Sequence, residues 1–202
     1  MTDKEHSWDK LLHIKTGGRD DLMSDEYRFP YEPTPYCVLE RLADSGLIQP
    51  GDVVLDYGCG KGRVEFFLSH GTGAKTIGIE YDERIYAEAM ENLKTARARA
   101  DFVLANGERY EVPPEVNRCY FFNPFSVEIL HKVMARILES WYGSPREVML
   151  FFYYPSDEYI SYLMTVDELD FYDEIECDDL FTGDARERIM IFTLPEELQG
   201  NC

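Results

Sequence analysis

The stretch VVLDYGCGKG, residues 53–62, is the strongest indication of the fold in this chain. It begins with three apolar residues typical of a buried strand and continues with glycines at positions 58, 60 and 62. A glycine loop between a strand and a helix lets the backbone approach a ligand closely and directs the helix N-terminus at that ligand. The stretch therefore predicts a strand, a ligand-binding loop and a helix that begins near residue 63.

Apolar runs alternate with helical patterns along the rest of the chain. Strands are expected at 53–57, 76–81, 101–105, 119–123, 148–154, 169–177 and 188–194, and helices at 37–46, 63–70, 83–97, 127–141 and 157–164. Nearly continuous apolar strands separated by helices indicate a largely parallel sheet that is covered on both faces. The last two strands have no helical pattern between them, so we expect them to form an antiparallel hairpin at one edge.

Two acidic residues indicate what the glycine loop binds. Asp56 lies at the end of the first strand, and Glu80 ends the second strand, 22 residues after Gly58. A carboxylate at the second position can accept hydrogen bonds from both hydroxyls of a ribose. A dinucleotide-dependent dehydrogenase is the alternative, but a carboxylate beside the loop suits an ammonium and a sulfonium better than a pyrophosphate.

DYGCGKG (56–62) resembles the DxGxGxG signature of class I S-adenosylmethionine-dependent methyltransferases, and IGIEYD (77–82) resembles their second-strand motif. The resemblance covers residues 51–194, and the whole chain is similar to small bacterial members of that class. It implies a Rossmann-like three-layer α/β sandwich. Its seven-stranded, mostly parallel sheet would have the order 3-2-1-4-5-7-6, with strand 7 antiparallel. It also implies S-adenosyl-L-methionine as the cofactor.

The resemblance assigns roles in cofactor binding. It places the acid matching Asp56 near the methionine end of the cofactor, the acid matching Glu80 on the ribose, and Asn106 on the adenine amino group. A simple Asn-Gly turn is the alternative for Asn106. The predicted cofactor-binding residues are Thr34, Asp56, Gly58, Cys59, Gly60, Gly62, Glu80, Tyr81 and Asn106.

The segment FFNPF (121–125) follows the fourth strand, beside the expected position of the transferable methyl group. Asn123, Pro124 and Phe125 are the predicted catalytic residues, since an Asn oxygen can accept a hydrogen bond from an amine that aromatic rings enclose. The segment is similar to the NPPY-type motif of amino-methylating nucleic-acid methyltransferases, with one proline missing. It also resembles the NNF segment of Rossmann-type histone-lysine methyltransferases. Alternatively, Asn-Pro only terminates the strand.

The chain divides into an N-terminal extension, residues 1–36, and a methyltransferase domain, residues 37–202. The extension contains a short amphipathic helix and the segment YEPTPY (31–36). This segment is similar to a Thr-Pro lid over the methionine part of the cofactor, although a rigid connector is equally compatible with it. Tyr153 and Tyr154, at the end of the fifth strand, are candidates for the wall of an acceptor pocket.

Charge constrains the methyl acceptor. The chain has 20 basic and 39 acidic residues, a net charge of −19, and residues 151–202 alone carry −12. Such a surface repels phosphates, so we expect a basic or neutral acceptor, such as a protein lysine or a small amine, and no nucleic-acid partner. A protein that binds the cofactor without transferring methyl is a further alternative.

The remaining composition argues against other classes of protein. Five scattered cysteines and four scattered histidines form no disulfide framework or metal-ligand pattern, so no metal site is predicted. No apolar run is long enough to span a membrane, and the polar N-terminus lacks the apolar core of a signal peptide. These features predict a cytoplasmic protein without a membrane anchor.

Overall fold

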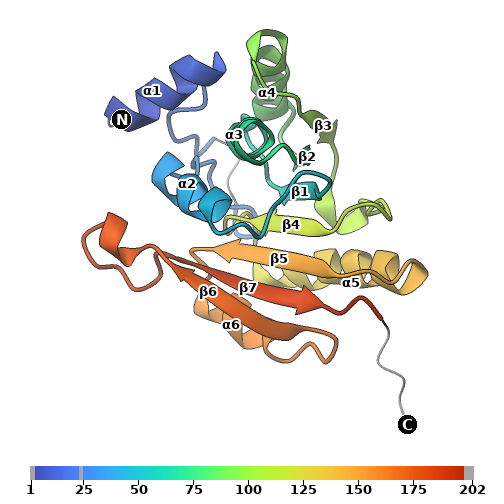
Figure 1. Cartoon of the computed structure of the whole chain (residues 1–202). Helices are drawn as coiled ribbons and strands as arrows, with labels where there is room; N and C mark the ends of the chain where they lie inside the picture. Colours follow the sequence, from blue (N-terminus) through green and yellow to red (C-terminus); the bar gives the residue numbers. More distant parts are fainter. Residues whose placement is uncertain (1–2, 23–24, 198–202) are drawn as a thin grey trace.

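A computed structural model describes residues 3–22 and 25–197 of the chain (Figure 1). The helices are α1 (Asp3–Leu12), α2 (Tyr36–Asp44), α3 (Arg63–Thr72), α4 (Glu83–Thr95), α5 (Val127–Gly143) and α6 (Asp157–Leu163). The strands are β1 (Val53–Tyr57), β2 (Lys75–Glu80), β3 (Asp101–Leu104), β4 (Arg118–Phe121), β5 (Val148–Tyr153), β6 (Asp170–Glu176) and β7 (Arg188–Leu194).

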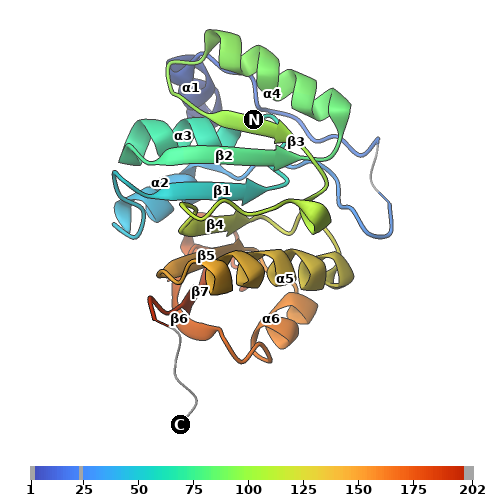
Figure 2. The same cartoon turned by 90° about the vertical axis from the view of Figure 1, so that its right-hand side faces the viewer.

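The strands form one seven-stranded sheet in the order β3-β2-β1-β4-β5-β7-β6. Strands β1 to β5 pair in parallel, and β7 lies antiparallel to both β5 and β6. Helices cover both faces of the sheet, which gives three layers (Figures 1 and 2). The predicted fold class, strand order and edge hairpin are therefore confirmed. One 3-10 turn, η2 (Asp178–Leu180), lies between β6 and β7, where the sequence indicated only a loop.

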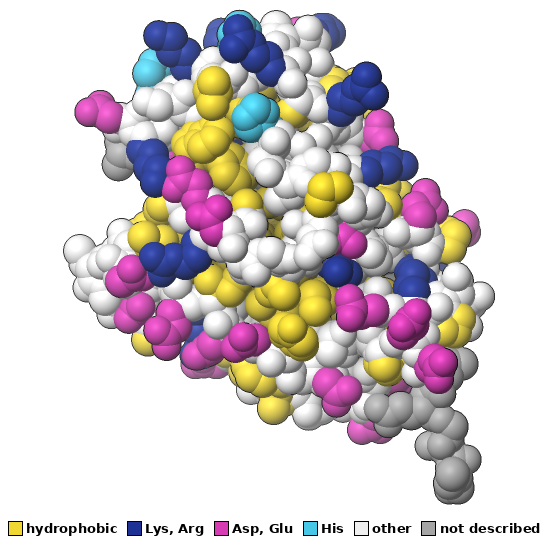
Figure 3. Space-filling model, viewed as in Figure 1, with side chains coloured by type: hydrophobic (Ala, Val, Ile, Leu, Met, Phe, Trp, Pro, Cys, Tyr) yellow, Lys and Arg dark blue, Asp and Glu magenta, His cyan; other side chains and the backbone are white. Residues whose placement is uncertain are grey.

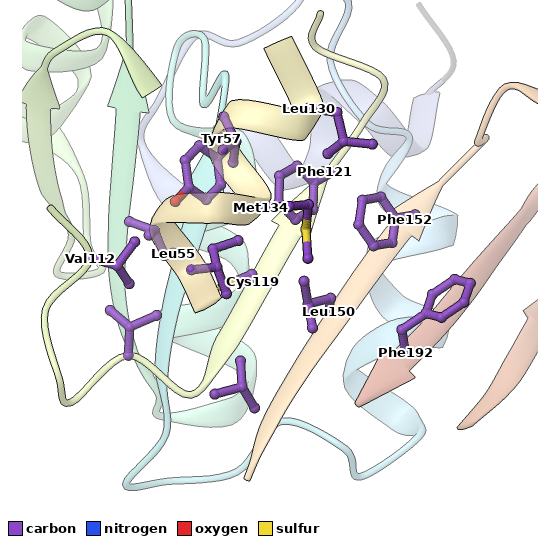
Figure 4. Packing of buried hydrophobic residues seen from close by; sticks show 14 of the residues in the cluster. Leu55, Tyr57, Val112, Cys119, Phe121, Leu130, Met134, Leu150, Phe152 and Phe192 are labelled. Atoms are coloured by element: carbon purple, nitrogen blue, oxygen red, sulfur yellow. The ribbon is translucent and has the colours of Figure 1, made fainter. Parts of the chain in front are cut away.

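One hydrophobic layer joins the sheet to α5 and α6. The rings of Tyr57 and Phe121 stack with centroids 5.0 Å apart, and those of Phe121 and Phe152 stack at 4.6 Å. Figure 4 shows these rings in a row across β1, β4 and β5, with Leu130 and Met134 of α5 against them. Stacked aromatics at the centre of the sheet fix the relative positions of the strand ends that carry the candidate site.

The opposite layer includes the N-terminal helix as well as α2 and α3. Leu12 of α1 is fully buried there, and Trp8 packs edge-on against Phe67 of α3 with ring centroids 4.8 Å apart. Arg63, the first residue of α3, is only 3% exposed, and its guanidinium lies 4.3 Å from the centroid of the Tyr36 ring. Its side chain also donates hydrogen bonds to Glu5, Thr16 and the backbone oxygen of Thr34. The N-terminal segment thus packs against the start of the first helix of the sheet.

Charge is distributed unevenly over the surface. On the face shown in Figure 3, Lys and Arg side chains gather around α1 and α4, and acidic side chains predominate over the region of β5 to β7. In the described part of the chain, the four cysteines are unpaired and no group of His, Cys, Asp or Glu side chains is arranged to hold a metal ion. Cys202 lies outside the described residues. No described helix is long and apolar enough to cross a membrane.

Candidate functional site

The glycine loop adopts a conformation that only glycine accommodates without strain. Gly58, Gly60 and Gly62 have φ angles of +81°, +58° and +87°. Other parts of the chain also approach them closely: a Cβ on Gly58 would lie 2.7 Å from Pro124, and one on Gly60 would lie 2.1 Å from the Tyr31 ring. The three glycines therefore let the backbone turn from β1 into α3 while two other segments close around it.

Glu80, the last residue of β2, fixes this loop from the neighbouring strand. One carboxylate oxygen accepts a hydrogen bond from the backbone N–H of Gly60 at 2.9 Å. The other accepts from the backbone N–H groups of Tyr81 and Asp82, both at 2.8 Å. Burial raises the pKa of the Glu80 carboxyl, whereas these three donors stabilise its charged form. A carboxylate has about four acceptor positions, so it retains capacity for a ligand hydroxyl at the floor of the cleft.

Asp56, at the end of β1, shares a buried site with a second acid that the sequence did not indicate. Asp56 is 3% exposed, and Glu65 from the first turn of α3 is 1% exposed. Burial raises the pKa of both carboxyls, and the nearby Asp56 charge raises that of Glu65 further. Glu65 fits because Gly78 of β2 has no side chain: a Cβ there would lie 2.5 Å from a Glu65 oxygen. Glu65 is therefore the member of this pair that more readily stays protonated, and Asp56 is the one available to a cation.

Asp56, Gly58 and Glu80 line one cleft at the carboxyl ends of the parallel strands, where ligands of open α/β sheets bind. Its polar lining includes Asp56 and Glu80, and its apolar lining, suited to a flat base, includes Ile79, Ile85, Ala105, Phe125 and Ile129. Tyr81 and Asn106 also line it. Tyr81 is 52% exposed, and the Asn106 amide is hydrogen-bonded to the backbone and side chain of Glu108 at 3.0 Å.

The N-terminal segment forms one wall of this cleft. Figure 2 shows it running along the edge toward which the arrows of β1, β2 and β3 point. Asp20 pairs with Arg84 of α4 at 3.2 Å, and the backbone N–H of Phe29 donates to the oxygen of Pro124 at 3.2 Å. Between these two anchors the Tyr31 ring covers Gly60. The segment is thus attached on both sides of the cleft, to α4 and to the loop after β4.

Thr34 is buried, with 3% of its surface exposed, and its hydroxyl is hydrogen-bonded to that of Tyr120 in β4 at 3.1 Å. It lines the cleft together with the rest of residues 28–34. Cys59 is also buried and lines the cleft, and burial raises the pKa of its thiol well above the ordinary value. Seven of the nine predicted cofactor-binding residues line the cleft, whereas Gly60 and Gly62 do not; the seven are Thr34, Asp56, Gly58, Cys59, Glu80, Tyr81 and Asn106.

A second cavity, of about 410 Å³, lies beside the cleft and shares part of its wall. Phe122 and residues 29, 30, 32 and 33 line both. The second cavity is also lined by Asn123, Tyr153, Tyr154, Phe181 and Glu187. Of the predicted catalytic residues, Asn123 therefore borders the second cavity, whereas Pro124 and Phe125 line the cofactor cleft.

Asn123 has two unusual properties. Its φ angle of +46° lies in the left-handed region, which Asn tolerates better than most residues. Its side-chain oxygen is buried and has no hydrogen-bond partner within the described part of the chain. Tyr154, across the second cavity, also has a positive φ, +51°, which for a bulky residue is a genuine outlier. Strained residues of this kind cluster at functional sites, and here both border one cavity.

Several residues of the site are not apparent from the sequence alone. Tyr31 and Phe29 belong to a Pro-rich segment in which Thr34 is the only residue predicted to bind the cofactor. Glu187 is one of 14 acidic residues after position 150, and only its contact with Tyr153 distinguishes it. Tyr153 and Tyr154, the candidates for the wall of an acceptor pocket, do line the second cavity.

The fold and the cleft define a class of protein: a Rossmann-like α/β domain with a cleft at the carboxyl ends of its parallel strands. Residues 54–143 match the sequence model of a family described as "Methyltransferase domain". A protein-lysine N-methyltransferase of Saccharolobus islandicus is 29% identical over 84 residues, which are 41% of this chain and 52% of that protein. The chain thus matches about half the length of this curated relative.

Solved structures share the fold across most of the chain. An RNA methyltransferase from Salinibacter ruber, in complex with S-adenosyl-L-homocysteine, has a TM-score of 0.60 and 19% identity over 84% of this chain and 98% of that one. A TehB-like S-adenosylmethionine-dependent methyltransferase from Corynebacterium glutamicum has a TM-score of 0.58 and 17% identity over 77% and 87% of the two chains. The chain therefore has the fold of these methyltransferases, and its residues 54–143 match the methyltransferase domain family.

The residues of the cleft fit the cofactor of that class, S-adenosyl-L-methionine. The strained glycine loop leaves the space that a bound nucleoside needs, and Glu80 offers an acceptor for ribose hydroxyls. Asp56 is buried at the cleft and would offer a negative charge to the ammonium or the sulfonium. The apolar side chains of the lining would suit the adenine.

Replacing Gly60 by alanine should weaken the binding of S-adenosylhomocysteine about tenfold. A non-glycine residue at this φ costs about 1–2 kcal/mol, and the new Cβ would overlap the Tyr31 ring. The loop and the cleft wall must therefore shift apart. Gly46→Ala is the matched control, because its φ is +74° and nothing lies within 4 Å of its Cβ position. Calorimetry should show weakened binding only for Gly60→Ala, and equal affinities of the two variants would contradict the assignment.

Proposed function

We propose that this chain is a methyltransferase that transfers the methyl group of S-adenosyl-L-methionine to an amine nitrogen, that of a protein lysine. The observation that carries the proposal is the position of Asn123, at the junction of the cofactor cleft and an aromatic cavity, with an unpartnered side-chain oxygen. Such an oxygen can accept a hydrogen bond from an amine N–H and orient the nitrogen lone pair.

The bound cofactor supplies an electrophilic methyl group: the amine lone pair forms the new N–C bond, sulfur keeps the electron pair of the broken C–S bond, and the acceptor loses one proton to water. The protein itself needs neither a nucleophile nor a metal for this transfer. Its contribution is to hold the amine in line and to exclude water, and positioning of this kind accounts for large rate effects. Asn123 orients the amine, while Phe122 and residues 29, 30, 32 and 33 line both cavities.

A lysine acceptor is favoured by the charge of the second cavity. Glu32, Glu187 and Arg19 line it, which leaves an excess of negative charge, and Glu187 belongs to a strongly acidic C-terminal quarter of the chain. A field of this sign attracts cations and repels phosphates. The curated relative whose sequence is similar to part of this chain is named as a protein-lysine N-methyltransferase. RNA, the substrate named for one structural neighbour, is disfavoured on the same electrostatic grounds.

We also propose that residues 1–36 act as the lid of the cofactor cleft. Their contacts with Arg84, Gly60 and Pro124 span the cleft from one side to the other. Opening this wall would break the ion pair of Asp20, which is partly exposed, while leaving the strongly buried Arg63 anchor intact. The cofactor would then enter by displacement of residues 18–22 and 25–33, with α1 remaining in place.

The proposal is tested by following a labelled methyl group. Purified protein is incubated with S-adenosylmethionine labelled in its methyl group and with separate protein, small-amine and RNA fractions of a cell extract. The expected product is labelled N-methyl-lysine in the protein fraction. No retention of mixed RNA below about 1 μM should be seen in a gel shift at about 0.15 M salt, where screening acts over about 8 Å. Label in RNA alone would contradict the proposal, and cofactor binding without any transfer would indicate a non-catalytic binding protein.

A further inference from the structure

We infer that the second cavity recognises its substrate as an aliphatic ammonium ion, and that Glu187, positioned by Tyr153, determines this specificity. The inference rests on the proposed transfer to nitrogen and adds the side chains that select the acceptor. Neither residue belongs to the cofactor cleft. Both line the second cavity, together with residues 29, 30, 32, 33 and 35 of the N-terminal segment.

Five of the twelve residues that line the cavity are aromatic. They are Phe29, Phe122, Tyr153, Tyr154 and Phe181, from the N-terminal segment, the ends of β4 and β5, and the hairpin. Faces of aromatic rings attract cations, and such walls also accommodate the methylene groups of an alkyl chain. The volume, about 410 Å³, lies within the range of small-ligand sites, about 300–1,000 Å³.

The Glu187 carboxylate is held in a fixed place. The hydroxyl of Tyr153 donates a hydrogen bond to it at 2.5 Å. The backbone around it is also fixed, because Cys177 donates to the oxygen of Glu187 at 2.8 Å and Glu187 itself donates to the oxygen of Asp184 at 3.0 Å. Tyr153 pairs with Ile189 in the antiparallel β5–β7 ladder, so the sheet register sets the Tyr153–Glu187 contact.

Glu187 differs from the neighbouring acids in its ion pairing. Glu32, also in the cavity, pairs with Arg19 at 3.3 Å, and Asp184 pairs with Arg186 at 2.9 Å. Glu187 forms no ion pair with any residue in the described ranges 3–22 and 25–197, although it lies between two arginines in the sequence. Its negative charge is therefore available to a ligand, and the missing counter-charge is the one an ammonium would supply.

The acceptor would thus enter as an ammonium ion, held by Glu187 and by the aromatic rings. One proton must leave to solvent before the nitrogen lone pair can form the new bond. A phosphate or a carboxylate would meet the negative charge of Glu187 in a cavity lined partly by aromatic rings. The repulsion disfavours the binding of such an anion. The hairpin loop thus places Glu187 beside the aromatic residues at the end of β5.

The test measures binding to the protein saturated with S-adenosylhomocysteine, so that it does not depend on turnover. The probes are n-butylamine, a short peptide with one central lysine, and the same peptide with norleucine in its place. Glu187→Gln retains the shape and an acceptor for the Tyr153 hydroxyl but removes the charge. We expect it to weaken binding of butylamine and of the lysine peptide about tenfold or more, and to leave the norleucine peptide and S-adenosylhomocysteine unaffected.

Glu176→Gln is the matched control, because it removes the same charge from an exposed position in β6, outside the cavity. Equal losses in both variants, or an unchanged affinity in Glu187→Gln, would overturn the inference while leaving methyl transfer to nitrogen intact. Failure of the wild-type protein to bind either amine would instead count against the proposed function itself. Tighter binding of the lysine peptide than of butylamine identifies a protein side chain as the source of the ammonium, and the reverse order identifies a small amine. Tyr153→Phe should give a smaller loss than Glu187→Gln, because it releases the carboxylate without removing it.

Discussion

Replacing Glu80 by alanine should weaken the binding of S-adenosylhomocysteine by about 10- to 100-fold. The change removes the proposed acceptor for the ribose hydroxyls, and a charged hydrogen bond contributes about 1.5–3 kcal/mol. It also releases the Gly60 N–H and leaves the loop without the carboxylate that fixes it. Titration calorimetry of the purified variant measures the effect.

Glu83→Ala provides the control for Glu80→Ala, because Glu83 is exposed at the start of α4, three residues further on. It should bind with the affinity of the wild type. Glu80→Gln should be intermediate, since its amide retains one acceptor oxygen. An unchanged affinity in a folded Glu80→Ala protein would show that the ribose is held elsewhere.

The Asn123→Ala variant should lose about 100-fold in turnover while its affinity for S-adenosylhomocysteine changes only a few-fold. Misplacement of an acceptor by about 1 Å can reduce a rate by this amount, and Asn123 borders the second cavity and is not among the residues lining the cofactor cleft. Initial rates of methyl transfer and calorimetry on the same preparation give the two values.

Two further substitutions separate this role from backbone strain at the same position. Asn123→Gly accommodates the φ of +46° without strain, and Asn123→Asp retains the shape of the side chain. If the side-chain oxygen orients the amine, Asn123→Gly should be as slow as Asn123→Ala. Recovery of turnover in Asn123→Gly, or loss of cofactor binding in Asn123→Ala, would show that Asn123 serves only to end the strand.

Much of the fold is predictable because its strands are continuous apolar runs. β1, β4 and β5 consist almost entirely of buried residues, and such runs separated by amphipathic helices are compatible with few arrangements. The hairpin of β6 and β7 is predictable from the absence of a helical pattern between its strands. Several boundaries shift by one or two residues: Asn123 lies two residues beyond the observed end of β4, because the Asn-Pro turn interrupts the strand pairing.

The cofactor residues are predictable for a different reason. Asp56, Gly58 and Glu80 lie at fixed places relative to strand ends, and local geometry requires glycine or an acid there. The acceptor cavity lacks such local signals. Glu187 meets Tyr153 across 34 residues, and Tyr31 meets Gly60 only because the N-terminal segment crosses the cleft.

The burial of polar residues is likewise not predictable from the local sequence. Arg63 has the sequence context of an ordinary residue at the start of a helix, and charged residues are rarely fully buried unless they are paired. Its burial follows from its partners on α1 and in the segment before α2, which lie about 30 to 60 residues earlier in the chain. Nothing in the local pattern around residue 63 identifies those partners.

The proposed reaction requires that the methyl group be delivered from the cleft toward the second cavity. A crystal structure of the protein with S-adenosylhomocysteine bound tests this directly. We predict that the ribose lies against Glu80, the methionine part near Asp56, and the sulfur beside Asn123, facing the cavity lined by Tyr153 and Glu187. A sulfur atom that faces away from that cavity, or a ligand bound outside the cleft, would contradict the account.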